Sequence, residues 1–160
     1  MLMTLSSIGS AILSTPFRLL LPAQLYTEML QQAQAELPNE CCGLLAGKLD
    51  TTGPVPLARI ERRYPLVNAA ASPREYLSDP HSMFAAERAR RNEGLDFLAV
   101  YHSHPTTEPK PSKTDLERNY SPDVMNLIIS LQAPTPVVKA WWLGETDYQE
   151  AEWEVIDGNQ

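Results

Sequence analysis

The sequence predicts an α/β protein, with a mixed β-sheet flanked by helices in a single domain. Short apolar runs bounded by Gly, Pro or Asn alternate with helix-like segments through the first two thirds of the chain. The last third holds strand-like runs with no long helix between them, which indicates strands added to the same sheet. A chain of 160 residues, 43% of them hydrophobic, is long enough to bury one core but not two.

The first part of the chain is expected to form a strand, a helix and two more strands. The apolar run 17–21 predicts the first strand, and Pro22 is expected at the first position of the helix, where its missing N–H costs nothing. An amphipathic pattern then continues to about Pro38. The run 40–47 predicts a buried strand, and 55–66 predicts a less buried one.

The second part begins with a long connection, 68–80, that leads into a second helix. Asp79 and Pro80 are typical of an N-cap and a first helical position, and Gly94 predicts the end of that helix. The run 95–104 is apolar on both faces in its middle and predicts a central strand. Three further strands are expected at 124–131, 137–143 and 148–156.

Charge and hydropathy limit the partners of the protein. The net charge of −7 and the pI near 4.9 argue against a nucleic acid or an anionic membrane as partner, since both require a basic surface. The first basic residue is Arg18, and no run reaches the ~18 apolar residues of a membrane span. We therefore expect residues 1–13 to form a loose N-terminal extension, and residues 14–158 to form the domain.

The two cysteines, Cys41 and Cys42, are adjacent in an apolar run. Neighbouring cysteines rarely bridge, because a disulfide needs separated and facing Cβ atoms. No disulfide framework is predicted, so a reducing, cytoplasmic location is expected. Both cysteines are expected to be small core residues, and their contact with a metal or substrate is left open.

Two of the three histidines, His102 and His104, lie one residue apart at the end of the strand predicted at 95–104. Residues two apart in a strand point to the same side, so both imidazoles are expected on one face. Pro105 should end the strand. A lone His-x-His is more often structural than metal-binding, and the assignment needs further ligands.

The run 112–120 predicts a short helix in which Ser112 is the N-cap and Asp115 lies in the first turn. By itself, Ser-x-x-Asp resembles a capping box. Combined with the two histidines, however, Asp115 supplies a third ligand and leaves one tetrahedral position open, as in catalytic zinc sites. We therefore expect Zn²⁺ as the cofactor.

Glu40 stands at the start of the apolar run 40–47, where a solvated carboxylate would be unusual. It is the candidate for a proton acceptor that does not bind the metal. With 20 acidic residues in the chain, a plain surface charge is the alternative for this residue taken alone.

These pieces occur in a fixed order along the chain. The pattern consists of Glu40, then His102-Ser103-His104-Pro105, a gap of six residues, and Ser112-x-x-Asp115. In order and spacing it resembles the JAMM (MPN+) metalloprotease pattern, and the likeness extends over about 17–156. It is closest to the small bacterial Mec-type peptidases. The resemblance implies a JAMM/MPN architecture of the cytidine-deaminase-like kind.

The resemblance also implies a role for each matching residue. His102, His104 and Asp115 would hold Zn²⁺. Glu40 would take a proton from the attacking water and return it to the leaving amine, and Ser112 would donate a hydrogen bond to the oxyanion. These roles agree with general acid–base chemistry and with electrostatic stabilisation of developing charge.

The substrate class rests on the resemblance as well. It implies a metallopeptidase or isopeptidase that hydrolyses the bond after the C-terminal Gly-Gly tail of a ubiquitin-like or sulfur-carrier protein. The connection 68–80 is long enough to form one wall of a groove for such a tail, and Arg74 and Tyr76 are the candidate substrate contacts there. The alternatives are a non-catalytic MPN-type interaction module and an amidohydrolase for small peptides.

Overall fold

The computed structural model describes residues 17–119 and 121–158. The N-terminal extension expected at 1–13 lies outside the described residues, so its boundary with the domain stays a prediction. Within the described part of the chain, no helix is long and apolar enough to cross a membrane. The expected cytoplasmic location also stays a prediction.

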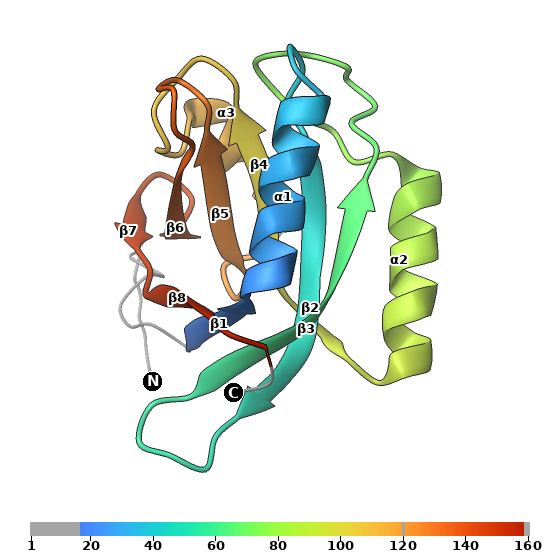
Figure 1. Ribbon diagram of the computed structural model, residues 1–160, viewed down its shortest axis with the longest axis vertical. Coiled ribbons are helices and arrows are strands. Elements are labelled where there is room, and N and C mark those ends of the chain that lie inside the picture. The colour runs from blue at the N-terminus through green and yellow to red at the C-terminus, as the bar shows by residue number, and fades with distance from the viewer. Residues whose placement is uncertain (1–16, 120, 159–160) are drawn as a thin grey trace.

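The described residues form one eight-stranded mixed sheet with three helices, in the strand order β7-β6-β5-β4-β2-β3-β1-β8 (Figure 1). The strands are β1 Arg18–Pro22, β2 Cys42–Asp50, β3 Leu57–Leu66, β4 Asp96–His104, β5 Met125–Ser130, β6 Val137–Leu143, β7 Tyr148–Glu150 and β8 Trp153–Ile156. The helices are α1 Ala23–Ala35, α2 Pro80–Glu93 and α3 Lys113–Glu117. The predicted fold class is confirmed.

The two long helices pack on opposite faces of the central strands (Figure 1). Leu45 of β2 belongs to the main core cluster with Met29 of α1, whereas its neighbour Leu44 belongs to a second cluster with Ala86 of α2. Adjacent side chains of a strand point to opposite faces, so β2 is apolar on both. We call the face of the sheet that is covered by α1 the inner face, and the face covered by α2 the outer face.

Strand β4 is central, as expected from its apolar middle. It pairs antiparallel with β2 and parallel with β5. Tyr101 points into the main core on the inner face, whereas Val100 packs in the outer cluster. Every second side chain of a strand points to the same face, and His102 and His104 are two and four residues after Val100. Both therefore lie on the outer face where β4 ends.

The signals at the ends of α2 act as predicted. The Asp79 side chain accepts a hydrogen bond from the backbone N–H of Ser82 at 3.0 Å, and Gly94 closes the helix with a left-handed φ of 69°. Pro22 differs from the expectation. It ends β1 in an extended conformation and is the N-cap of α1, so the first helical residue is Ala23.

The single strand predicted at 148–156 is wrong. The segment forms two strands at opposite edges of the sheet, β7 beside β6 and β8 beside β1. Between them the Ala151 N–H donates to the Ala140 carbonyl at 2.8 Å, and the Glu152 carbonyl accepts from the Leu19 N–H at 3.1 Å. Two residues therefore connect the two edges, which requires the sheet to curl strongly around α1.

Candidate metal centre

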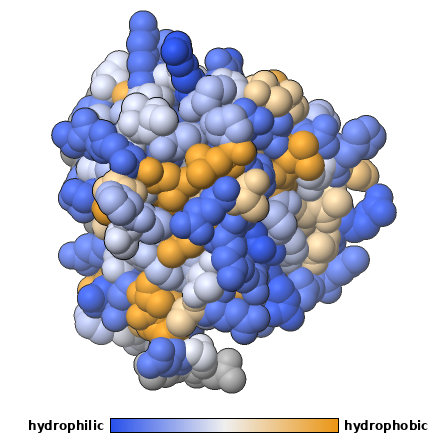
Figure 2. Space-filling view, turned by 45° about the horizontal axis from the view of Figure 1, so that its top comes forward, coloured by the Kyte–Doolittle hydropathy of each residue, from blue (hydrophilic) through white to orange (hydrophobic). Residues whose placement is uncertain are grey.

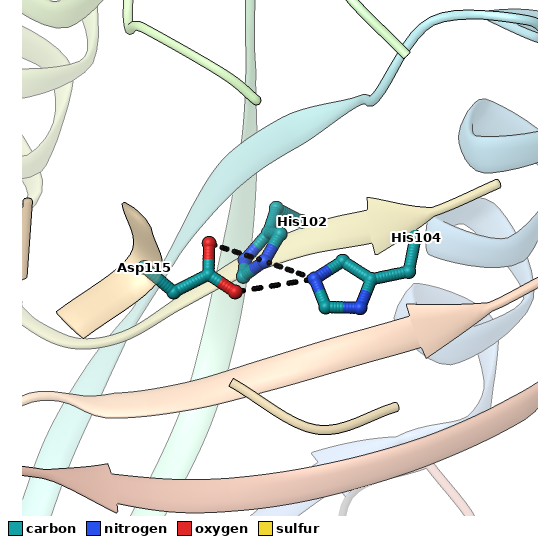
Figure 3. A group of neighbouring side chains, drawn as sticks. All are labelled: His102, His104 and Asp115. Atoms are coloured by element: carbon teal, nitrogen blue, oxygen red, sulfur yellow. Dashed lines mark hydrogen bonds and ion pairs between the residues drawn. The ribbon is translucent and has the colours of Figure 1, made fainter. Parts of the chain in front are cut away.

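Strand β4 brings His102 and His104 together at its end, on the outer face of the sheet. Their rings are almost fully buried, and the two Nε2 atoms lie 3.1 Å apart. Asp115 of α3 reaches the same place, with Oδ1 at 3.2 Å from Nε2 of His102 and Oδ2 at 3.1 Å from Nε2 of His104. The three side chains converge on one point (Figure 3).

This donor set fits a zinc ion. Zinc bonds of ~2.0–2.1 Å in a tetrahedron place neighbouring ligand atoms roughly 3.3 Å apart, close to the separations of 3.1 to 3.2 Å found here. Two imidazoles and one carboxylate oxygen are ligands that Zn²⁺ accepts, and three protein ligands leave a fourth position open. The cluster could therefore hold one metal ion in a catalytic type of geometry.

A backbone carbonyl sets the orientation of His104. Its Nδ1–H donates to the carbonyl oxygen of Glu108 at 2.8 Å, so in the neutral ring Nε2 is the unprotonated nitrogen and is free to bind a metal. Burial alone lowers the pKa of His104, but the bonds to Asp115 and to the Glu108 carbonyl outweigh it, and the pKa is raised. The loop after Pro105 thus prepares a metal-binding tautomer.

The Asp115 carboxylate is held by the helix that carries it. Ser112 and Asp115 form a capping box, in which the Ser112 Oγ accepts from the Asp115 N–H at 3.1 Å. Asp115 Oδ2 in turn accepts from the Ser112 N–H at 2.9 Å. Burial opposes ionisation of Asp115, but the neighbouring His102 and His104 and the Ser112 N–H hold its pKa well below the usual range.

Glu40 precedes β2 and is buried, with an exposed fraction of 3%. Its Oε1 has no hydrogen-bond partner among the described residues. Burial raises the pKa of Glu40 to about 8; the charges of Asp115 and Glu75 add to the rise, and His104 opposes it. An unpaired buried carboxylate near a metal site is typical of a functional group.

The connection after β3 brings Tyr76 to the site. The Tyr76 ring lies over the His102 ring, with centroids 4.7 Å apart and an angle of 31° between the planes. Arg74 is exposed, and its backbone N–H donates to Ser72 Oγ. The roles of Arg74 and Tyr76 as substrate contacts stay predictions.

Two residues that the sequence did not single out also shape the site. Asn68 is a buried amide in the connection, with bonds to Glu40 and to the segment around Tyr76. Arg118, just after α3, makes an ion pair of 2.8 Å with Glu75 and so joins the two sides of the site. An Asn directly after an apolar strand is a recognisable turn signal, but its partners are not readable from local sequence.

The cysteines are core residues, as expected. Both are free and buried, and burial raises the pKa of each thiol to about 12. Cys42 lies on β2 directly opposite His102, and the Cys41 N–H donates to Ser103 Oγ at 2.8 Å. Neutral thiols at these positions pack in the core beside the pairing of β2 with β4, the strand that carries the histidines.

An apolar cavity of about 200 Å³ lies beside the centre. It reaches from Tyr76 and Val100 to Met83 of α2. A larger depression of about 800 Å³, between α1 and β3, contains none of the predicted site residues. Size alone therefore does not locate the chemistry, whereas the converging ligands do.

Known proteins are similar to this chain in sequence and fold. Residues 22–144 match the family described as prokaryotic homologs of the JAB domain. The CysO-cysteine peptidase of Mycobacterium tuberculosis is 33% identical over 120 residues, which cover 75% of this chain and 78% of the relative. The probable TtuB-protein conjugate cleaving protease of Thermus thermophilus is 37% identical over 100 residues, or 62% of each chain.

A solved structure agrees with these matches. The solution structure of a Desulfitobacterium hafniense protein superposes with a TM-score of 0.78 at 35% identity, covering 88% of this chain and 94% of that one. The family and the peptidase class predicted from the motifs agree with these relatives. The chain belongs to the family of prokaryotic homologs of the JAB domain.

Proposed function

We propose that the protein is a zinc-dependent peptidase or isopeptidase that hydrolyses the bond after the C-terminal Gly-Gly tail of a ubiquitin-like or sulfur-carrier protein. One observation carries the proposal. Two histidine nitrogens and a carboxylate converge within bonding reach of one ion, near a buried Glu40 with an unpaired oxygen. Metal ligands and a separate proton acceptor are the two parts that metal-assisted amide hydrolysis requires.

His102, His104 and Asp115 would hold the metal through the atoms that face one another in Figure 3. When bound there, zinc supplies Lewis acidity and lowers the pKa of water toward ~7. Burial raises the pKa of the nearby Glu40 carboxyl to about 8, and this pKa would be lowered by a cation held at the cluster. Glu40 would then be ionised at neutral pH.

Glu40 is the proposed general base and general acid. Its carboxylate takes a proton from the attacking water, and the same oxygen later returns that proton to the amine that leaves. The buried position suits this work, because no other protein group competes for Oε1 among the described residues. General acid–base groups of this kind contribute ~10²–10⁴-fold to rates.

Ser112 is the proposed oxyanion donor. The capping bond uses a lone pair of its Oγ as acceptor, so the hydroxyl hydrogen remains available for donation. The cap also fixes the serine backbone next to Asp115, which keeps the donor close to the metal ligands. Capping and catalysis therefore make compatible demands on one hydroxyl group.

The substrate class is supported by the relatives and by the surface. One relative is named for a CysO-cysteine bond and another for cleaving a protein conjugate. The end of the molecule with α3 and the end of β4 is turned toward the viewer in Figure 2, where apolar side chains form a broken band on a largely polar face. Val67, just before the connection, and Leu77, within it, are 60% and 54% exposed. Such a surface suits a folded carrier domain better than a short peptide.

The test is hydrolysis by the zinc-loaded protein. Ubiquitin-like and sulfur-carrier proteins ending in Gly-Gly, joined to cysteine or to a lysine side chain, are compared with the same conjugates ending in Ala-Ala. We expect cleavage after Gly-Gly and little after Ala-Ala, because the proposed specificity is for a tail without side chains. Equal cleavage of a free Gly-Gly dipeptide amide would instead favour a small-peptide amidohydrolase. Binding without cleavage would favour an interaction module.

A further inference from the structure

Asn68 uses every hydrogen-bonding position of its side chain. It lies just after β3 with an exposed fraction of 9%. Its Nδ2 donates to the carbonyls of Glu40 at 3.0 Å and Glu75 at 3.1 Å. Its Oδ1 accepts from the N–H groups of Ala70 and Leu77, both at 3.0 Å. An amide supplies two donors and an acceptor with two lone pairs, so this inventory is complete.

These bonds close the connection 68–79 on itself. The Ala69 N–H donates to the Leu77 carbonyl at 2.7 Å, and Asn68 forms an isolated antiparallel bridge with Ser78. The amide of Asn68 bonds to three residues of this loop, Ala70, Glu75 and Leu77. The Asn68 side chain and these backbone bonds together shape the segment that places Tyr76 over His102.

The same loop hydrogen-bonds to both backbone groups of Glu40, its N–H and its carbonyl. The Glu40 carbonyl accepts from Asn68, and the Glu40 N–H donates to the Ser72 carbonyl at 2.8 Å. Glu40 precedes the first residue of β2, so at this point the loop supplies the bonds that a sheet would supply further on. The direction of the Glu40 side chain follows from how these two bonds fix its backbone.

We propose that Asn68 is a positioning residue, which holds Glu40 and the Tyr76 wall in one fixed relation to the metal ligands. Its catalytic part rests on the proposed function. Hydrogen-bond partners that orient the ligands of metal sites typically affect metal affinity or activity by 10–100-fold, and we expect an effect of this size for Asn68. The Nδ2 bond to the Glu40 carbonyl acts on the proton-transfer residue, and the bonds to Glu75, Ala70 and Leu77 act on the wall.

Two substitutions separate these effects. Asn68→Asp keeps the oxygen that accepts from Ala70 and Leu77. It replaces the NH₂ group, which donates to two carbonyls, with a carboxylate oxygen that repels them. We expect kcat about 10–100-fold lower, with KM changed less than in Asn68→Ala, because the two bonds to Oδ1 remain. Asn68→Ala removes all the bonds, so kcat should fall and KM should rise together. Zinc content is measured in both variants and should equal that of the parent.

The matched control is Asn126→Ala. Asn126 is another buried amide, on β5, and it donates to Asn119 and to the Val124 carbonyl, away from the connection. This variant should lower the melting temperature while kcat stays within about 3-fold of the parent. A kcat loss in Asn126→Ala equal to that in Asn68→Ala would reduce the role of Asn68 to general stability.

A double-mutant cycle tests whether Asn68 acts through Glu40. In a Glu40→Gln background, Asn68→Asp should lower the residual turnover by less than about 3-fold, because the group it positions is already removed. A full 10–100-fold loss in that background, or a parent-like kcat for Asn68→Asp alone, would overturn the proposal.

Amide exchange gives a readout that needs no substrate. In the zinc-loaded protein, exchange of the Glu40 N–H should be faster by about 10-fold or more in Asn68→Ala than in the parent. Unchanged exchange would refute the proposal that Asn68 holds the Glu40 backbone, even if no substrate were ever cleaved. If the parent cleaves no Gly-Gly conjugate while Glu40 exchange still responds, the proposed function fails and the structural role of Asn68 remains.

Discussion

One oxygen atom of Asp115 connects the cap of α3 with the metal cluster: Oδ2 accepts the Ser112 N–H at 2.9 Å and lies 3.1 Å from Nε2 of His104. A metal-binding carboxylate is thus oriented by the first turn of its own helix. The five residues of α3 are enough for this purpose, since only the cap and one turn are used.

Ser112 variants separate capping from oxyanion stabilisation. Asp caps helices as well as Ser, so Ser112→Asp should keep its stability. At neutral pH its carboxylate only accepts hydrogen bonds, and turnover should fall by ~10²-fold or more. Ser112→Ala should lose ~1 kcal/mol of stability together with most of its activity. Melting temperature, zinc content and kcat are measured for both. A zinc-loaded Ser112→Ala with the parent rate would leave the hydroxyl as a cap alone.

Metal binding is expected to depend on the cluster and not on histidine content. The parent should bind about one Zn²⁺ per chain, and His104→Ala should lose it, because two ligands hold zinc poorly. His81→Ala, an exposed histidine at the start of α2, is the matched control and should bind like the parent. Elemental analysis after dialysis gives the result, and full occupancy in His104→Ala would reject the assignment.

Glu40→Gln should separate the metal from the chemistry. The amide cannot accept and return a proton, so turnover is expected to fall by ~10²–10⁴-fold while zinc stays bound. Glu117→Gln, at the exposed end of α3, removes the same charge without touching the cluster and should be near normal. Stopped assays on a Gly-Gly conjugate measure kcat. Near-normal turnover of Glu40→Gln would remove this residue from the mechanism, and loss of zinc would make it a ligand.

The raised pKa of Glu40 predicts how the stability of the metal-free protein depends on pH. Its folded pKa of about 8 lies above the ordinary 4.5, so the folded state holds the proton more tightly. The stabilisation is complete below the ordinary pKa and is lost as the pH rises through the folded value. Glu40→Gln avoids this loss and should melt about 5 °C or more above the parent at pH 8.5, with a smaller difference at pH 5. Parallel melting curves across this range would contradict the assigned pKa.

Gly47 is expected to be required by the pairing of β2 with β3. A Cβ there would overlap the backbone carbonyl of Arg59, so the paired strand would have to shift. Gly47→Ala should destabilise the protein by about 3 kcal/mol, a drop of roughly 6–12 °C in melting temperature. Gly53→Ala, where a Cβ would meet nothing within 4 Å, is the control and should be neutral or slightly stabilising. Equal melting temperatures for the two variants would show that β3 shifts freely.

Sequence patterns predicted the features that short segments decide. Asp79 and Gly94 mark the two ends of α2, and they could be predicted because a cap acts within one helical turn. The two-residue repeat of a strand predicted that His102 and His104 share one face. The split of 148–156 was missed because both halves have the same alternation, and only distant partners distinguish them. The four bonds of Asn68 were missed for a similar reason, since they exist only once the connection has closed.

The parallel pairing of β1 with β8 has a consequence for the order of folding. It joins Leu19 to Trp153, almost the full length of the described chain apart. Contacts at such separation are formed late, because chain closure must be offset by structure already in place. During synthesis, the hairpin of β2 and β3 and the site strand β4 emerge long before β8. The edge of β1 that β8 covers therefore stays unpaired until residue 156 has left the ribosome. During this interval the nascent chain is most exposed to pairing with strands of other chains.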